Sequence, residues 1–151
     1  MKNFDVMMLP RERFRLIGRV VLWFALGGIF LVILAVYFSG LAARRNVQRL
    51  KDVQTITVAL HQYAADHAGT YPDGLDAEEK QIGSAVTGCA VKTAQCAVKA
   101  TNDCLNLTPA LSPYLKDMPT DPKSGSDART RYSVRLERGG RLLVTACDYT
   151  E

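Results

Sequence analysis

One uncharged, mostly apolar run, Val20–Ala43, limits the possible folds of this chain more than any other feature. Its sequence is VVLWFALGGIFLVILAVYFSGLAA. A helix rises about 1.5 Å per residue, so the run reaches about 36 Å and can cross a hydrocarbon core of about 30 Å. A soluble core helix and a cleaved secretory signal, whose apolar part is usually about 7–15 residues, fit less well. We therefore expect an uncleaved transmembrane helix over residues 20–43, surrounded by a lipid bilayer.

Positive charge flanks this run and does not extend over the rest of the chain. Residues 1–43 hold five Lys/Arg and two Asp/Glu, residues 44–52 hold four and one, and residues 53–151 hold ten and twelve. A flanking excess of this kind suits anionic lipid headgroups. A nucleic-acid-binding domain needs a basic face of its own, so we expect no nucleic acid among the partners.

The orientation of the helix in the membrane is predicted from the cysteines, because the flanking charges balance. Four basic residues lie in the nine residues before the run and four in the eight residues after it (Arg11, Arg13, Arg15 and Arg19; Arg44, Arg45, Arg49 and Lys51). That balance gives no positive-inside preference. All four cysteines follow the run (Cys89, Cys96, Cys104 and Cys147). An even number in one small domain indicates disulfides and an oxidising compartment. We expect a cytoplasmic basic arm over 1–19 and an extracytoplasmic head over 44–151, in the inner (cytoplasmic) membrane.

Residues 44–67 contain no Gly or Pro and continue the helix in amphipathic form. Val53, Ile56, Leu60 and Tyr63 recur at spacings of three, four and three, which is typical of a helix with one buried face. His67 extends this stripe, and we expect it to be a partly buried packing residue. The sequence predicts one long helix from about residue 14 to about residue 67, whose outer half packs on the head.

The remaining residues predict a small antiparallel sheet, and hence an α+β fold class. Two alternating runs, Tyr132–Leu136 and Leu142–Cys147, predict a β-hairpin within 131–148. Residues 73–104 predict an irregular or hairpin-like loop held by at least one disulfide, with a short helix around Ala77–Ile82. A second short helix should begin near Thr108 as N-cap, with Pro109 at its first position.

Four cysteines allow three pairings. We expect Cys89–Cys96 and Cys104–Cys147, the second of which would close a loop of roughly 40 residues and add about 3–4 kcal/mol of stability by the chain-entropy estimate.

Three segments together resemble a known family. The first is RLKDVQTITVALHQYAADHAGTYP, which is similar to the family stretch in which the helix ends before Gly and Tyr-Pro. The second is LSPYLKDMPTDP, which is similar to the family segment that closes with Leu-Pro-x-Asp-Pro. The third is RYSVRLERGGRLLVTACDYTE, which is similar to the closing hairpin of the family. The family is that of the type IV pilins and the pseudopilins of type II secretion. The resemblance implies a bacterial, pilin-like protein with a structural role in a type IV filament or secretion apparatus, and other pilin-like subunits as partners. It also implies that the head can lie in an extracellular filament.

The segment that this family uses for processing and assembly differs here. The family pattern Gly-Phe-Thr-Leu-Ile-Glu, cut after the Gly, aligns with Arg13-Phe14-Arg15-Leu16-Ile17-Gly18. Phe14, Leu16 and Ile17 match. Arg13 replaces the Gly that the prepilin peptidase requires, and Gly18 replaces the Glu that pairs with a neighbour's N-terminus. The alternative is therefore a membrane-anchored protein that does not polymerise and whose pilin-like head is a binding module.

Catalytic chemistry is not expected. The histidines are His61 and His67, both on the predicted helix, and the cysteine spacings do not match zinc sites. Because some pseudopilins bind calcium in a C-terminal loop, we considered three carboxylates as ligands (Asp121, Asp127 and Asp148). Turn-forming and capping roles are favoured for them. We expect a protein that is not an enzyme and has no cofactor.

Overall fold

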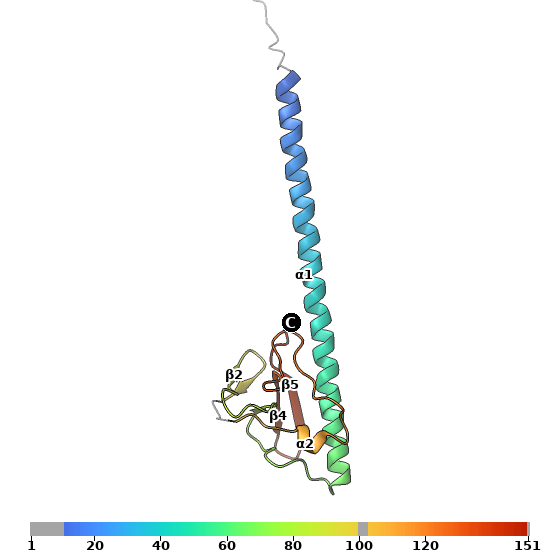
Figure 1. The fold of residues 1–151 in the computed structure, drawn as a ribbon, viewed down its shortest axis with the longest axis vertical. Coiled ribbons are helices and arrows are strands. Elements are labelled where there is room, and N and C mark those ends of the chain that lie inside the picture. The colour runs from blue at the N-terminus through green and yellow to red at the C-terminus, as the bar shows by residue number, and fades with distance from the viewer. Residues whose placement is uncertain (1–10, 100–102, 151) are drawn as a thin grey trace, which may run out of the picture. The chain divides into compact units, whose positions relative to one another are not determined.

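The computed structural model describes residues 11–99 and 103–150, with side chains from Arg19 onward. Helix α1, Arg11–Asp66, is the longest element and contains both helical segments expected from the sequence (Figure 1). The chain divides into two compact units at the Leu41–Ala42 bond, and α1 contributes to both.

The first unit consists of the apolar part of α1. The large apolar side chains from Val20 to Phe38 are at least 50% exposed, except for Leu34, which is half-buried. The most apolar stretch of 18 residues in α1 has no buried residue, and by length and composition α1 can cross a membrane. The first unit therefore contains a candidate membrane span.

The second unit, the head, joins residues 42–66 of α1 to two small antiparallel sheets (Figure 1). The larger sheet has the strand order β1-β4-β5, with β1 at Lys80–Gln81, β4 at Tyr132–Leu136 and β5 at Leu142–Ala146. Strands β2 (Val91–Lys92) and β3 (Ala97–Val98) form the other. The short helix α2 spans Thr108–Leu111. The expected α+β class, with a long apolar N-terminal helix and a small antiparallel sheet, is confirmed.

The β4–β5 hairpin forms as its alternating pattern predicts. Tyr132 pairs with Ala146 and Leu136 pairs with Leu142 at the two ends of the register. The connecting turn requires two left-handed residues, which Gly139 and Gly140 supply with φ values of 89° and 79°.

The core lies between α1 and the larger sheet. Ile56 and Leu60 are fully buried beside Tyr132 and Val134 from β4. The other two residues of the predicted stripe, Val53 and Tyr63, are partly buried against the same cluster. Six more buried side chains complete the buried part of this cluster (Ala59, Ile82, Leu107, Leu111, Val144 and Ala146). The four stripe residues thus lie on the head-facing side of α1.

Two short-range expectations were wrong. Residues 77–82 form no helix, because Lys80 and Gln81 instead pair with β4 as the edge strand β1. Thr108 is not an N-cap, because it is already the first residue of α2 and Leu107 precedes it as the cap. The side-chain oxygen of Asn106 accepts a hydrogen bond from the Thr108 amide at 3.2 Å. In both places long-range or neighbouring contacts outweigh the local preference.

His67 was also expected to be partly buried, and it is exposed. Its ring stacks on Tyr63 with 3.8 Å between ring centroids, and its Nδ1 lies 2.8 Å from the Tyr63 carbonyl oxygen. The apolar stripe therefore ends at Ala64, two residues before the end of α1 at Asp66.

All four cysteines form disulfides, as expected, but the expected pairing was wrong. The bonds are Cys89–Cys104 and Cys96–Cys147, with Cα–Cα distances of 5.2 and 5.1 Å. The segment between the first pair folds back through the β2–β3 hairpin, so its two ends meet. The hairpin turn then places Cys96 against the end of β5, where Cys147 is buried with Val91 and Val98.

Candidate functional site: a buried ion pair beside a basic pocket

The head-facing side of α1 carries charged residues between its apolar stripe and the candidate span. Arg49 is 3% exposed and Asp52 is 6% exposed, although both belong to the most polar part of the helix. Each precedes a residue of the apolar stripe by four, Arg49 before Val53 and Asp52 before Ile56, so they occupy the same helical face. The sequence analysis counted Arg49 among the flanking charges that suit lipid headgroups, whereas the structure buries it in the head.

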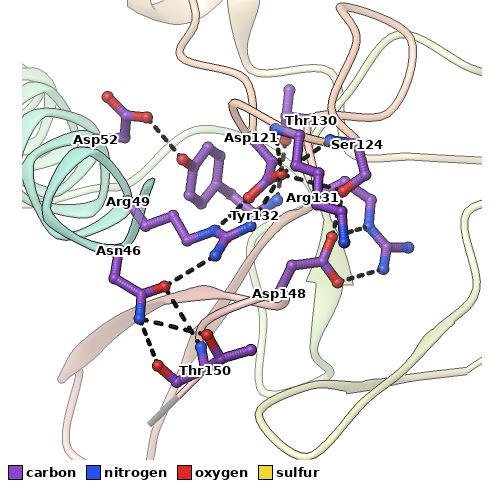
Figure 2. Close-up of polar contacts among 11 residues, drawn as sticks. Asn46, Arg49, Asp52, Asp121, Ser124, Thr130, Arg131, Tyr132, Asp148 and Thr150 are labelled. Atoms are coloured by element: carbon purple, nitrogen blue, oxygen red, sulfur yellow. Dashed lines mark hydrogen bonds and ion pairs between the residues drawn. The ribbon is translucent and has the colours of Figure 1, made fainter. Parts of the chain in front are cut away.

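Arg49 forms a bidentate ion pair with Asp121 (Figure 2). Its Nε donates to Oδ2 at 2.6 Å, and its Nη2 donates to Oδ1 at 3.3 Å. Its Nη1 donates to the side-chain oxygen of Asn46 at 2.9 Å. The side chains of Arg49 and Asp121 are only 4% and 1% exposed. The pair therefore joins α1 to the loop before β4 through a contact shielded from water.

Asp121 also organises its own loop. Its Oδ1 accepts hydrogen bonds from the backbone amides of Lys123 and Ser124 at 2.9 and 3.0 Å, and from the Ser124 hydroxyl at 3.1 Å. The tight turn leaves no room at Gly125, where an added Cβ would lie 2.3 Å from the Asp121 nitrogen. One carboxylate thus holds the loop closed and fastens it to α1.

These contacts decide the charge state of the pair. Burial opposes ionisation of Asp121, but hydrogen bonds from Arg49 and from two backbone amides outweigh it and lower the pKa of Asp121 to about 2. The hydrogen bond to Asp121 correspondingly raises the pKa of Arg49. Both groups are charged at neutral pH.

A second polar contact joins α1 to the sheet one turn further along. The Tyr132 hydroxyl donates to Asp52 Oδ2 at 2.7 Å (Figure 2). Gln48 Nε2 donates to Oδ1 of the same carboxylate, also at 2.7 Å. Burial, and then this hydrogen bond, raise the pKa of Tyr132. The phenol therefore remains a donor throughout the physiological range.

Arg131 and Asp148 form a more open ion pair at the ends of β4 and β5 (Figure 2). Arg131 donates from Nε at 2.9 Å and from Nη2 at 2.6 Å. This hydrogen bond is the main reason that the pKa of Asp148 is lowered. The Ser124 hydroxyl also contacts Asp148. Arg131 has a φ of 67°, a left-handed conformation that costs a non-glycine residue about 1–3 kcal/mol.

A pocket of about 590 Å³ lies between these groups and the first turns of α1 in the head. Among the described residues, four cations and one carboxylate line it (Arg45, Arg49, Lys123, Arg131 and Asp148), and together they carry a formal net charge of +3. Arg45 and Lys123 form no ion pair within residues 19–99 and 103–150. We call this feature the basic pocket.

The three carboxylates considered for calcium are not gathered around one point. Asp121 and Asp148 both contact Ser124, but each is paired with an arginine. Asp127 is exposed, and its backbone carbonyl accepts a hydrogen bond from the Ser84 amide. In the part of the chain that the structure describes, no group of three or more His, Cys, Asp or Glu residues could hold a metal ion.

The remaining residues named from the sequence lie elsewhere. His61 is exposed and hydrogen-bonds to the Tyr71 hydroxyl at 3.1 Å. The processing-like segment, Arg13 to Gly18, is helical in its backbone, but its side chains lie outside the described residues. The fold and the site define a class no finer than an α+β head carried by a long apolar helix. No family model, curated protein or solved structure matches the chain.

Proposed function

We propose that this chain is a single-pass membrane protein whose pilin-like head acts as a structural subunit of a type IV filament or secretion-type apparatus. Its partners are the lipid bilayer and, through α1, other pilin-like subunits. One observation carries the assembly role: within the head, the outer face of α1 presents large apolar side chains to the surroundings.

Val47, Leu50 and Val58 form this outer face and are 68%, 56% and 48% exposed. At 100° per residue Val47 and Val58 lie nearly opposite Ile56 and Leu60, which face the core, and Leu50 lies on the flank of the helix beside Val47. All three follow the uncharged run in sequence and belong to the head. Burying each such side chain contributes about 1.5–3 kcal/mol. Packing against another α1 helix would therefore stabilise an assembly.

The cysteines, and not the flanking charges, support an N-terminus in the cytoplasm. The basic residues close to the run balance, four before it and four after it, and give no positive-inside preference. The two disulfides agree with an extracytoplasmic head.

The second candidate is a membrane-anchored protein that does not polymerise and uses its head to bind a ligand. Arg13 and Gly18 favour it, since the family pattern has the peptidase's Gly and the assembly Glu there. The basic pocket gives such a head a site of its own.

Cysteine crosslinking distinguishes the two candidates. No free cysteine exists in the chain, so Val47→Cys introduces a single reactive thiol on the outer face. Arg138→Cys, on the exposed turn between β4 and β5, is the matched control for random collisions. In native membranes, assembly predicts a disulfide-linked dimer that forms at position 47 many times faster than at 138. Equal, slow rates at both positions would reject α1 packing and favour the anchor.

The N-terminal sequence of the protein from its native membrane provides an independent test. A start at Phe14 means that the Arg13–Phe14 bond is cut and supports a processed subunit. An intact Met1, together with equal crosslinking rates, leaves the anchor as the better description.

A further inference from the structure

We propose that the basic pocket binds a phosphate oxyanion and that the headgroup of an anionic phospholipid supplies it. This inference rests on the proposed membrane anchor and assigns the anchor a lipid preference. Its starting point is that Arg45 and Lys123 face the pocket without an ion-pair partner in the described part of the chain.

The charges of the pocket suit an anion. Its one carboxylate, Asp148, is already neutralised by Arg131. Asp121 likewise neutralises Arg49 at the pocket wall. The two remaining cations, Arg45 and Lys123, therefore set the net attraction. Arg45 comes from α1 and Lys123 from the loop before β4, so they approach a bound phosphate from different elements.

Neutral donors complete the lining. Thr93 Oγ1 accepts the amides of Gln95 and Cys96 at 3.3 and 3.1 Å. Both of these bonds use the lone pairs of the hydroxyl, so its O–H remains able to donate to a ligand. The Cys96–Cys147 disulfide fixes this loop beside the Arg131–Asp148 pair. The walls are thus held in place before any ligand binds.

The position of the pocket along the chain favours a lipid as the source of the phosphate. Ala42 lines the pocket and belongs to the uncharged run, and Arg45 follows the end of that run by two residues. Two residues span at most about 7 Å. The headgroup region of one leaflet is about 5–7 Å thick, as half the difference between the full bilayer and its hydrocarbon core. With the uncharged run in the hydrocarbon core, as proposed above, Arg45 follows the end of the run closely enough to reach the headgroups.

The test measures lipid retention by the full-length protein. The protein is extracted in mild detergent, incubated with phosphatidylglycerol or phosphatidylcholine, and analysed by native mass spectrometry. The wild type should retain phosphatidylglycerol in preference to phosphatidylcholine. Arg45→Ala and Lys123→Ala should each weaken this preference about 5-fold, and the double variant about 30-fold.

The matched control is the double variant Lys116→Ala with Arg138→Ala. It removes the same charge from exposed sites outside the pocket and should keep the wild-type preference. Peptide mapping without reduction checks that each variant keeps both native disulfides. If the Arg45 and Lys123 double variant loses them, Lys123→Glu alone must abolish the preference.

Three outcomes would overturn the proposal. The pocket variants could retain phosphatidylglycerol like the wild type, or the control could lose as much as they do. Inorganic phosphate could also displace the lipid at millimolar concentration, which would assign the pocket to a soluble anion. Carbonate extraction separates these from a failure of the membrane anchor. Release of the protein by carbonate rejects the anchor, whereas retention without a lipid preference rejects only the pocket assignment.

Discussion

Replacing Arg49 by methionine removes the cation of the buried pair and keeps a long apolar stem on α1. The variant loses the two hydrogen bonds to Asp121 and the one to Asn46. Breaking a buried pair typically costs about 3–5 kcal/mol. Asp121 keeps its two loop amides and the Ser124 hydroxyl, so its charge is not left without donors. We therefore expect a loss of about 3 kcal/mol, at the lower end of this range.

Removing the other partner should cost more. Asp121→Leu leaves Arg49 charged at 4% side-chain exposure, and it also leaves the loop donors without their acceptor. Each buried donor without a partner adds about 1–3 kcal/mol. We expect Asp121→Leu to destabilise the head by at least about 2 kcal/mol more than Arg49→Met does.

The same pair predicts a pH dependence. The pKa of Asp121 is lowered to about 2 in the folded head, whereas an unfolded aspartate has a pKa of about 3.9. Its contribution is therefore complete above about pH 4 and is lost as the pH falls toward 2. The difference corresponds to at most about 2.5 kcal/mol, less any solvent screening. In Arg49→Met the loss should be smaller and should end at a higher pH, because the folded pKa of Asp121 moves back toward its unfolded value when the hydrogen bond from Arg49 is gone.

Hydrogen exchange measured by mass spectrometry on the full-length protein in detergent provides the free energies. Peptides from β4 and β5 report opening of the head without interference from the apolar half of α1. The reasoning is refuted if Arg49→Met differs from the wild type by less than about 0.5 kcal/mol, the usual range of neutral surface substitutions, or if Asp121→Leu is the milder of the two. A pH profile that is unchanged in Arg49→Met would refute the assigned cause of the lowered pKa.

Three further predictions use the same measurement. Replacing Cys96 and Cys147 by serine opens a crosslink with a sequence separation of 51 and should cost about 4 kcal/mol, whereas a cost below about 1 kcal/mol would contradict the unfolded-state argument. Tyr132→Phe leaves the buried Asp52 without its 2.7 Å donor and should cost about 1–3 kcal/mol, whereas a neutral effect would mean that water replaces the phenol. Gly125→Ala places a Cβ 2.3 Å from a backbone nitrogen of its own loop and should cost about 1–3 kcal/mol; wild-type stability would show that the loop relaxes freely.

The apolar part of this fold could be predicted from the sequence because it depends on local periodicity. The spacing that includes Ile56 and Leu60 indicates the buried face of α1 without knowledge of its partner. The alternation around Gly139 and Gly140 likewise indicates the β4–β5 hairpin. Both signals need only residues that are close neighbours along the chain.

The candidate site could not be predicted in this way because its contacts are distant in sequence. Arg49 and Asp121 are 72 residues apart, and an arginine near a membrane span is ordinarily assigned to headgroups. One available signal was its position one helical turn before Val53, on the buried face. The disulfide pairing could not be predicted for a related reason. It follows from the β2–β3 hairpin, whose strands have only two residues each and therefore leave too short a pattern in the sequence.

The buried pair also explains how a head can have one fixed position on a long, repetitive helix. Along α1 the apolar stripe recurs every three or four residues, so a slip of one turn that brings Leu60 to the place of Ile56 would exchange one apolar side chain for another and cost little. The same slip would move Arg49 away from Asp121 and leave two buried charges unpaired, which costs several kcal/mol. In the native register Arg49 and Asp121 pair at 2.6 Å. Apolar burial thus supplies the affinity between α1 and the sheet, and the ion pair supplies the register.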